Sequence, residues 1–169
     1  MSAIHPASLS ESQLLKDCTE RRTRRSGPGG QHRNKVETAV ILKHEPTGVE
    51  AEANECRSQS ENRREAVFRL RVRLALTVRT EQPLEPSTSE LWQSRCRNGR
   101  ISINPHHDDF PAILAEALDI LAANSFEVPA AAITLGCSAT QLVKLLKDEP
   151  KAFQLLNQER TNRSLSHLR

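Results

Sequence analysis

The chain has 169 residues, enough for one ordinary domain or two small ones, and 37% are apolar and 27% charged. This composition is globular rather than disordered, and no apolar run reaches the roughly eighteen residues of a membrane span. The net charge of +3 is unevenly spread: residues 20–80 hold 14 Lys/Arg and 8 Asp/Glu, and the rest carries a net −3. Such a basic patch attracts polyanions, nucleic acid first among them, although the alternative is an ordinary solvated basic face.

The cysteines and the N-terminus bear on the cellular compartment. The N-terminus has no basic region followed by an apolar one, so it does not resemble a secretory signal. Four cysteines are widely spaced without a C-x-x-C pair, which argues against zinc and against a disulfide framework: Cys18, Cys56, Cys96 and Cys137. We therefore expect a cytoplasmic protein without a membrane partner, metal or cofactor.

The first quarter of the chain predicts a short helix followed by strands. Residues 8–17 can form the helix, with Ser8 or Ser10 as its N-cap. The polar stretch 18–24 suits an edge strand, and the β-branched stretch 36–44 suits a core strand. A turn signal at Pro46-Thr47-Gly48 leads into residues 49–55, whose alternation indicates a hairpin partner.

Residues 58–79 fit two structures. The stretch "FRLRVRL" alternates like a strand, yet Val67, Leu70, Leu74 and Val78 follow helical spacing. Ser58-x-x-Glu61 is a capping-box pattern, and the stretch is long for one strand. We predict a helix.

The second half predicts a linker and then helices. Residues 80–90 are rich in Pro, Ser and Thr, and residues 91–107 suggest a turn and a short extended piece. Helices are expected at 109–124, 127–136, 139–147 and 150–161. The stretch His106-His107-Asp108-Asp109 is better explained as a loop ending in an Asp N-cap than as a metal site. Cys137 is better explained as a small buried apolar residue than as a nucleophile.

The basic stretch "RSGPGGQHRNK" at residues 25–35 carries the most specific chemistry. Glycines accept positive φ and let a partner approach the backbone, while Pro28 stiffens the entry. Such a stretch can present Gln31 and free backbone N–H groups to an oxyanion or phosphate. A glutamine has no usable proton equilibrium, so it can position water or bind a transition state but cannot act as a general base.

Several motifs follow one another in a fixed order, namely Ser26-Gly27-Pro28-Gly29-Gly30-Gln31-His32, Asn34-Lys35, Glu37-x-Ala39-Val40, Pro46-Thr47-Gly48 and Arg57-Ser58-Gln59-x-x-Asn62-Arg63. In this order and spacing, about residues 17–79 resemble the catalytic domain of class I peptide chain release factors and their short ribosome-rescue relatives.

The resemblance implies that the Gly-Gly-Gln loop enters the peptidyl transferase centre and promotes attack of water on the peptidyl-tRNA ester. Gly29, Gly30 and Gln31 would be catalytic, with the Gln31 N–H stabilising the oxyanion. The implied partners are the large ribosomal subunit, its RNA and peptidyl-tRNA. We expect the protein itself to be a monomer. The residues implied to contact RNA are Arg25, Ser26, His32, Arg33, Asn34, Lys35, Arg57, Ser58, Gln59, Asn62, Arg63 and Arg64. For Arg57, Gln59, Asn62, Arg63 and Arg64, helix capping and solvation is the alternative.

The sequence also departs from the family. Arg33 stands where the family commonly has an aliphatic residue. No stop-codon-reading domain or dense basic tail is evident, so we expect codon-independent release from stalled ribosomes or large subunits.

The stretch "AAITLGCSATQLVKLL" resembles the centre of a helix-turn-helix, with Gly136 making the turn, Ser138 capping the second helix and Leu142 packing between helices. Simple helical packing is the alternative. Candidate RNA contacts in this part are Lys144, Lys147, Lys151, Arg160 and Arg163.

Together these patterns predict an α+β protein. Residues 8–80 would form a release-factor-like catalytic domain, a short antiparallel sheet with a packed long helix. Residues 81–107 would be a linker, and 108–169 an all-α, helix-turn-helix-like domain. The alternative functions are a non-catalytic ribosome- or RNA-binding protein on the same scaffold, and a DNA-binding regulator that uses the C-terminal helices.

Overall fold

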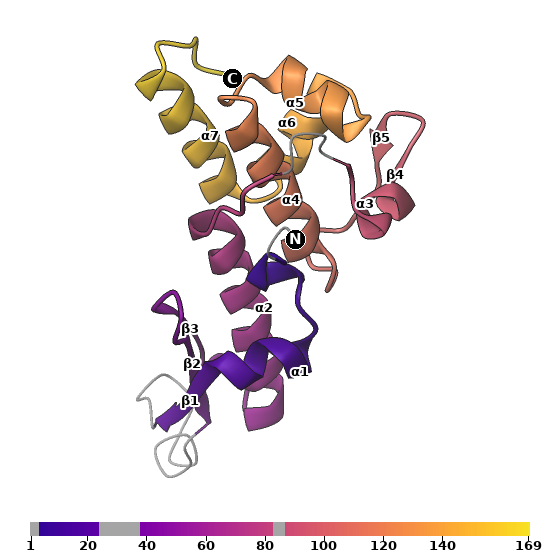
Figure 1. Cartoon of the computed structure of the whole chain (residues 1–169). Coiled ribbons are helices and arrows are strands. Elements are labelled where there is room, and N and C mark those ends of the chain that lie inside the picture. Colours follow the sequence, from indigo (N-terminus) through magenta and orange to yellow (C-terminus); the bar gives the residue numbers. More distant parts are fainter. Residues whose placement is uncertain (1–3, 24–37, 83–86) are drawn as a thin grey trace. The chain divides into compact units, whose positions relative to one another are not determined.

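The structure is a computed structural model of the whole chain that describes residues 4–23, 38–82 and 87–169 (Figure 1). Contacts divide it into two compact units. One is Leu9–Leu74, and the other is Ala75–Arg169 together with the N-terminal residues up to Ser8. The expected α+β class is confirmed, because the described residues form a short three-stranded antiparallel sheet, a two-stranded hairpin and seven α-helices.

The first unit begins with helix α1 (Glu11–Leu14), which continues into a 3-10 turn, η2 (Leu15–Asp17). Ser10 caps α1 with a complete capping box: its Oγ accepts the Gln13 N–H, and its own N–H donates to Gln13 Oε1. Of the two N-caps considered from the sequence, Ser10 therefore caps the α-helix, and the helix is shorter than expected.

The sheet of the first unit has the order β1-β2-β3, with every neighbouring pair antiparallel. Its strands are β1 (Cys18–Thr23), β2 (Ala39–His44) and β3 (Val49–Ala53). Strand β2 lies in the middle and buries Val40 and Leu42. The polar strand β1 lies at an edge, as its sequence predicts. The predicted turn connects β2 to β3, with Gly48 at φ +70° and its N–H bonded to His44 O.

Helix α2 (Gln59–Thr77) confirms the helical interpretation of residues 58–79. Every fourth residue from Asn62 is buried, namely Asn62, Ala66, Leu70 and Leu74, and the neighbouring Val67 and Ala75 are buried too, so the buried residues form a single stripe along the helix. Arg69 Nη1 donates to Glu52 O at 2.9 Å, and Arg73 Nη1 donates to Glu50 O. These two arginines therefore join the helix to strand β3.

The second unit is mainly helical (Figure 1). Its helices are α3 (Glu90–Arg95), α4 (Phe110–Ala123), α5 (Val128–Leu135), α6 (Ala139–Lys147) and α7 (Pro150–Asn162). Helix α4 is buried along most of its length and packs against α3, α5 and α6. The four helices predicted after residue 108 are confirmed, each to within two residues at either end.

The N-terminal residues pack into this helical unit. The 3-10 turn η1 (Pro6–Ser8) contacts α4, and Ala7 is fully buried. The His5 ring lies 3.1 Å from Val78 O and accepts the Ala7 N–H at 3.0 Å. Burial lowers the pKa of His5. Deeper in the unit, Trp92 is 1% exposed and donates its indole N–H to Leu135 O at 2.8 Å.

A small hairpin follows α3. Its strands are β4 (Cys96–Arg97) and β5 (Arg100–Ile101). Asn98 and Gly99 join them with φ of 50° and 74°, the positive values that a two-residue type I′ turn requires. Residues 87–107, expected to belong to a linker, thus contain a helix and a hairpin. Among the helices that the structure describes, none combines the length and apolar character needed to cross a membrane.

Candidate functional site

The segment that carries Gly29-Gly30-Gln31 joins strand β1 to strand β2. Residues 24–37 lie outside the described part of the chain, and with them lie the predicted site residues Arg25, Ser26, Gly29, Gly30, Gln31, His32, Arg33, Asn34 and Lys35. The strands on either side are described, and Thr23 pairs with Ala39 in the sheet register. This pairing holds both ends of the segment together at one end of the sheet.

Asn62 fixes the return of the chain into β2. Its side chain is fully buried, although an amide would be costly to bury without partners. The Nδ2 group donates to Thr38 O at 2.8 Å and to Cys56 O at 2.9 Å, and Oδ1 accepts the Cys56 N–H at 2.9 Å. The expected RNA contact by Asn62 is therefore corrected, because this side chain is hydrogen-bonded to backbone groups and has no surface exposed to a partner.

Arg63 is held by two carboxylates. Its Nε lies 2.8 Å from Glu20 on β1, and its Nη1 lies 2.9 Å from Glu11 on α1. The hydrogen bond from Arg63 holds the pKa of Glu20 below its usual value. Arg63 thus connects the start of α2 to β1 and α1, and its charge is largely neutralised by these partners.

Arg57 and Arg64 differ from Arg63 in being exposed, and no salt bridge joins either to an acid within the described ranges. Ser58 Oγ accepts the Glu61 N–H at 3.4 Å and so caps α2, the alternative role considered for it. Gln59 is half-buried on the first turn. Of the six residues expected to contact RNA at this helix start, Arg57 and Arg64 keep free cationic groups.

Comparison with known proteins bears on this arrangement. A family profile described as the RF-1 domain matches residues 12–105, more than half of the chain. This chain belongs to the class I peptide chain release factor family. The matched release-factor region includes the sheet, α2, α3 and the β4–β5 hairpin.

Individual release factors align with part of this chain. Peptide chain release factor 2 of Aromatoleum aromaticum is 43% identical over 81 residues, which cover 44% of this chain and 22% of that protein. Peptide chain release factor 1 of Xylella fastidiosa is 48% identical over 59 residues, 35% and 16% of the two chains. The chloroplastic release factor PrfB1 of Arabidopsis thaliana is 44% identical over 63 residues, 37% and 14%. The chain therefore spans about a fifth or less of the length of these relatives.

The helix-turn-helix pattern beyond the release-factor region has the expected local geometry. Gly136 ends α5 in the left-handed conformation, with φ 65°. Ser138 caps α6 by accepting the Gln141 N–H, and Leu142 is fully buried. Helices α5 and α6 therefore form a helix–turn–helix pair.

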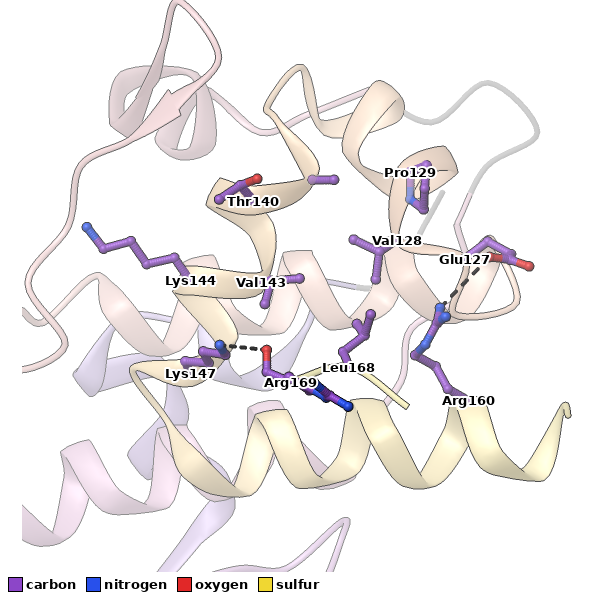
Figure 2. A pocket seen from close by; sticks show the side chains of 11 residues that line it. Glu127, Val128, Pro129, Thr140, Val143, Lys144, Lys147, Arg160, Leu168 and Arg169 are labelled. Atoms are coloured by element: carbon purple, nitrogen blue, oxygen red, sulfur yellow. Dashed lines mark hydrogen bonds and ion pairs between the residues drawn. The ribbon is translucent and has the colours of Figure 1, made fainter. Parts of the chain in front are cut away.

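Two arginines proposed as RNA contacts in the C-terminal part have structural partners instead. Arg160 is 6% exposed and donates to Phe126 O and Ser166 O, both at 2.9 Å. Figure 2 shows it reaching toward Glu127, 3.8 Å away. Arg163 pairs with Glu159 and lies over the Phe126 ring. The expectation for Arg160 is corrected, because its guanidinium is buried and bonded to backbone carbonyls.

The three lysines among the candidate C-terminal RNA contacts are exposed, unlike Arg160. Lys144 and Lys147 line a cavity of about 650 Å³ between α5, α6 and the C-terminal residues (Figure 2). Lys147 donates to Arg169 O at 2.8 Å and lies over the Phe153 ring. Lys144 and Lys151 are exposed, and no salt bridge engages either among the described residues.

The stretch 106–109 and Cys137 have structural roles. Asp109 occupies the N-cap position of α4 but makes no side-chain cap, because its carboxylate binds Arg95 at 2.6 Å. No cluster of three or more potential metal-binding side chains occurs within the described ranges. Burial raises the pKa of the Cys137 thiol to about 11, which makes it a poor nucleophile at neutral pH.

Proposed function

We propose that this protein promotes hydrolysis of the ester between a nascent peptide and tRNA, working on the ribosome. The observation that carries the proposal is the Gly29-Gly30-Gln31 sequence, in a segment whose ends are held by the Thr23–Ala39 pairing and by Asn62. Membership of the release factor family and curated relatives called peptide chain release factors support it.

The chemistry assigned to Gln31 follows from its side chain and backbone. In the proposal, its backbone N–H stabilises the oxyanion that develops on the reacting or leaving oxygen. Its amide side chain admits water and excludes bulkier nucleophiles. Because glutamine does not titrate, proton transfer falls to RNA and substrate. The protein contributes positioning and electrostatic stabilisation.

Binding to the ribosome is assigned to cationic groups that the structure leaves free. Arg57 and Arg64 at the start of α2 are exposed, whereas Arg63 is neutralised by two carboxylates. Phosphate contacts by such groups position a protein on RNA without reading its sequence. The residues of the 24–37 segment expected to contact RNA belong to the same proposal.

We further propose that release does not require a stop codon and acts on stalled ribosomes or free large subunits. The region shared with release factors is the one that carries Gly-Gly-Gln. The residues after it form helices with a helix–turn–helix pair and exposed lysines, which supports targeting through nucleic-acid contacts rather than codon reading.

The decisive experiment measures peptide release from ribosomes with a stop codon, from ribosomes without one, and from separated large subunits. We expect comparable release from ribosomes with and without a stop codon.

Gly30→Ala and Gln31→Ala should abolish release while co-sedimentation with ribosomes persists, because these residues offer few phosphate contacts. Full release by Gly30→Ala would contradict the catalytic role assigned to the Gly-Gly-Gln sequence. Release that needs the stop codon would overturn codon independence, and ribosome binding without release by the unaltered protein would favour the non-catalytic alternative.

A further inference from the structure

The β4–β5 hairpin places three arginines on one of its faces. Cys96 pairs with Ile101 and Arg97 with Arg100, and the Ser102 N–H donates to Arg95 O at 2.8 Å, which extends the pairing by one step. Because side chains alternate across a strand, the arginines share one face, and Cys96 and Ile101 occupy the other. We call the set Arg95, Arg97, Arg100 and Ser102 the hairpin face.

The hairpin face carries an electrostatic cost within the folded protein. Arg97 and Arg100 lie directly opposite each other in the register, where like charges destabilise a strand pair. Both are exposed, and no salt bridge to either occurs among the described residues. An anion between the two guanidinium groups would remove this repulsion and could accept bidentate hydrogen bonds from them.

The hairpin is fixed to the turn of the helix–turn–helix pair. The Ser138 N–H donates to Gly99 O at 3.1 Å, and the Ile101 N–H donates to Gln141 Oε1 at 3.2 Å. The Cys96 thiol contacts Gly136 O at 3.6 Å. These contacts attach the inner side of the hairpin to the end of α5 and the start of α6, so the arginines have a defined position beside α6.

Two hollows adjoin the hairpin face. One, of about 310 Å³, is lined by the hairpin face with Ser94. The other, of about 610 Å³, shares Arg95 and Arg100 and adds Gln141 and Lys144 from α6. Asp109 neutralises Arg95, but the buried Arg95 Nε has no hydrogen-bond partner among the described residues. The two hollows together thus offer Arg97, Arg100 and Lys144 as unneutralised cations.

We propose that the hairpin face and Lys144 form a binding site for the phosphodiester backbone of RNA. Guanidinium groups suit phosphate oxygens because their planar donors match them in pairs, and neighbouring cations suit a chain of phosphates. The choice of RNA over DNA rests on the proposed ribosomal function. The site gives the helical unit a means of engaging the ribosome that is separate from Arg57 and Arg64.

The test uses the full chain and fluorescence anisotropy with a labelled RNA duplex, and with a DNA duplex of the same sequence, over a series of KCl concentrations. Arg97→Thr/Arg100→Thr should weaken RNA binding by at least about tenfold and reduce the slope of log affinity against log salt by about two. The melting temperature should stay equal or rise, because the variant loses the repulsion and keeps good strand formers. A structural role alone would instead lower it.

The matched control is Lys16→Glu/Arg169→Glu, at two exposed cations to which no RNA contact is assigned. It should change RNA affinity much less than Arg97→Glu/Arg100→Glu, which alters the charge by the same amount. Unchanged affinity and salt slope in the threonine variant, or equal losses in the two charge reversals, would overturn the site. Tighter binding of the DNA duplex would overturn the assignment to RNA. Gln31→Ala should bind the duplex normally, so failure of this site is distinguishable from failure of the proposed hydrolysis.

Discussion

Asn62 satisfies its amide with backbone groups from two separate places in the chain. It bonds Thr38, which precedes β2, and both the N–H and the carbonyl of Cys56, which precedes α2. The position also sits on the stripe that continues through Ala66, Leu70 and Leu74. A polar residue that falls at the four-residue spacing of an apolar stripe indicates a buried, hydrogen-bonded side chain. The sequence carries this signal at position 62, and it favours a structural role over an RNA contact.

Replacing Asn62 should damage stability and activity together. Asn62→Ala leaves partly buried backbone groups of Thr38 and Cys56 without their side-chain partner, so we expect a loss of about 1–3 kcal/mol in the free energy of unfolding. Peptide release should fall more than ribosome binding, because one end of the Gly-Gly-Gln segment loses its anchor. Urea denaturation and a release assay measure the two effects. Asn162→Ala, at an exposed asparagine whose side chain bonds Gln158 on the same helix, should stay within about 0.5 kcal/mol of wild type. A similarly small loss for Asn62→Ala would contradict the anchoring role.

The Glu20–Arg63 pair predicts a pH-dependent contribution to stability. The folded pKa of Glu20 is lowered chiefly by the Arg63 hydrogen bond, so the contribution is present above the unfolded pKa and disappears as pH falls through the folded pKa. Glu20→Gln should cost less than about 1 kcal/mol near neutral pH, since both groups are partly exposed. The difference between variant and wild type should vanish in strong acid.

Denaturant titrations at a series of pH values test this, with Glu61→Gln on the exposed side of α2 as the control. A difference between Glu20→Gln and wild type that stayed constant from neutral to strongly acidic pH would show that the carboxylate charge contributes nothing.

At the level of elements, the start of α2 is a short basic surface made of Arg57 and Arg64. Arg57→Glu/Arg64→Glu should weaken ribosome binding by more than about tenfold, equivalent to 1.4 kcal/mol, and should make the binding less sensitive to salt. Lys16→Glu/Lys43→Glu changes the charge equally within the same unit and should have little effect. Co-sedimentation at several salt concentrations measures both variants. Equal losses would place the RNA-facing surface elsewhere.

Local signals accounted for most of the elements. Ser10 and Ser138 cap the helices where the sequence indicates, and Gly136 ends α5 in the left-handed conformation. The backbone contacts of Arg160 and the β4–β5 hairpin within the expected linker were not anticipated. Whether an arginine faces solvent or a backbone carbonyl depends on residues far away in sequence, as Arg160 shows by bonding Phe126 O. Hydrophobic periodicity does not record such contacts.

At the scale of the whole molecule, the N-terminal residues up to Ser8 belong with the helical unit and not with the unit that follows them in sequence. The contact between His5 and Val78 O joins positions 73 residues apart. No local pattern predicts so distant a pairing. Along the chain, the two segments that make up the helical unit are separated by the whole of Leu9–Leu74.

Removing the N-terminal residues should consequently destabilise the helical unit. Deletion of residues 1–8 exposes the surface of α4 that η1 covers and removes the buried His5 and Ala7, so we expect a loss of about 1–3 kcal/mol in the unfolding of that unit. Thermal unfolding followed by a probe within the helical unit measures it. Ile4→Ser, at a side chain that is 71% exposed, serves as the control and should have no effect. An unchanged unfolding midpoint after the deletion would show that η1 adds nothing to the unit.

The buried Trp92 supplies the spectroscopic probe for such measurements. It is the single tryptophan of a chain that has no tyrosine, and it donates its indole N–H to Leu135 O inside the helical unit. Intrinsic emission excited at the indole band therefore reports on the helical unit alone, whereas far-ultraviolet circular dichroism sums over the whole chain. When the two signals are followed in one titration, coincident curves mean that the units unfold together. Separated curves give each unit its own midpoint without a label or an added reporter.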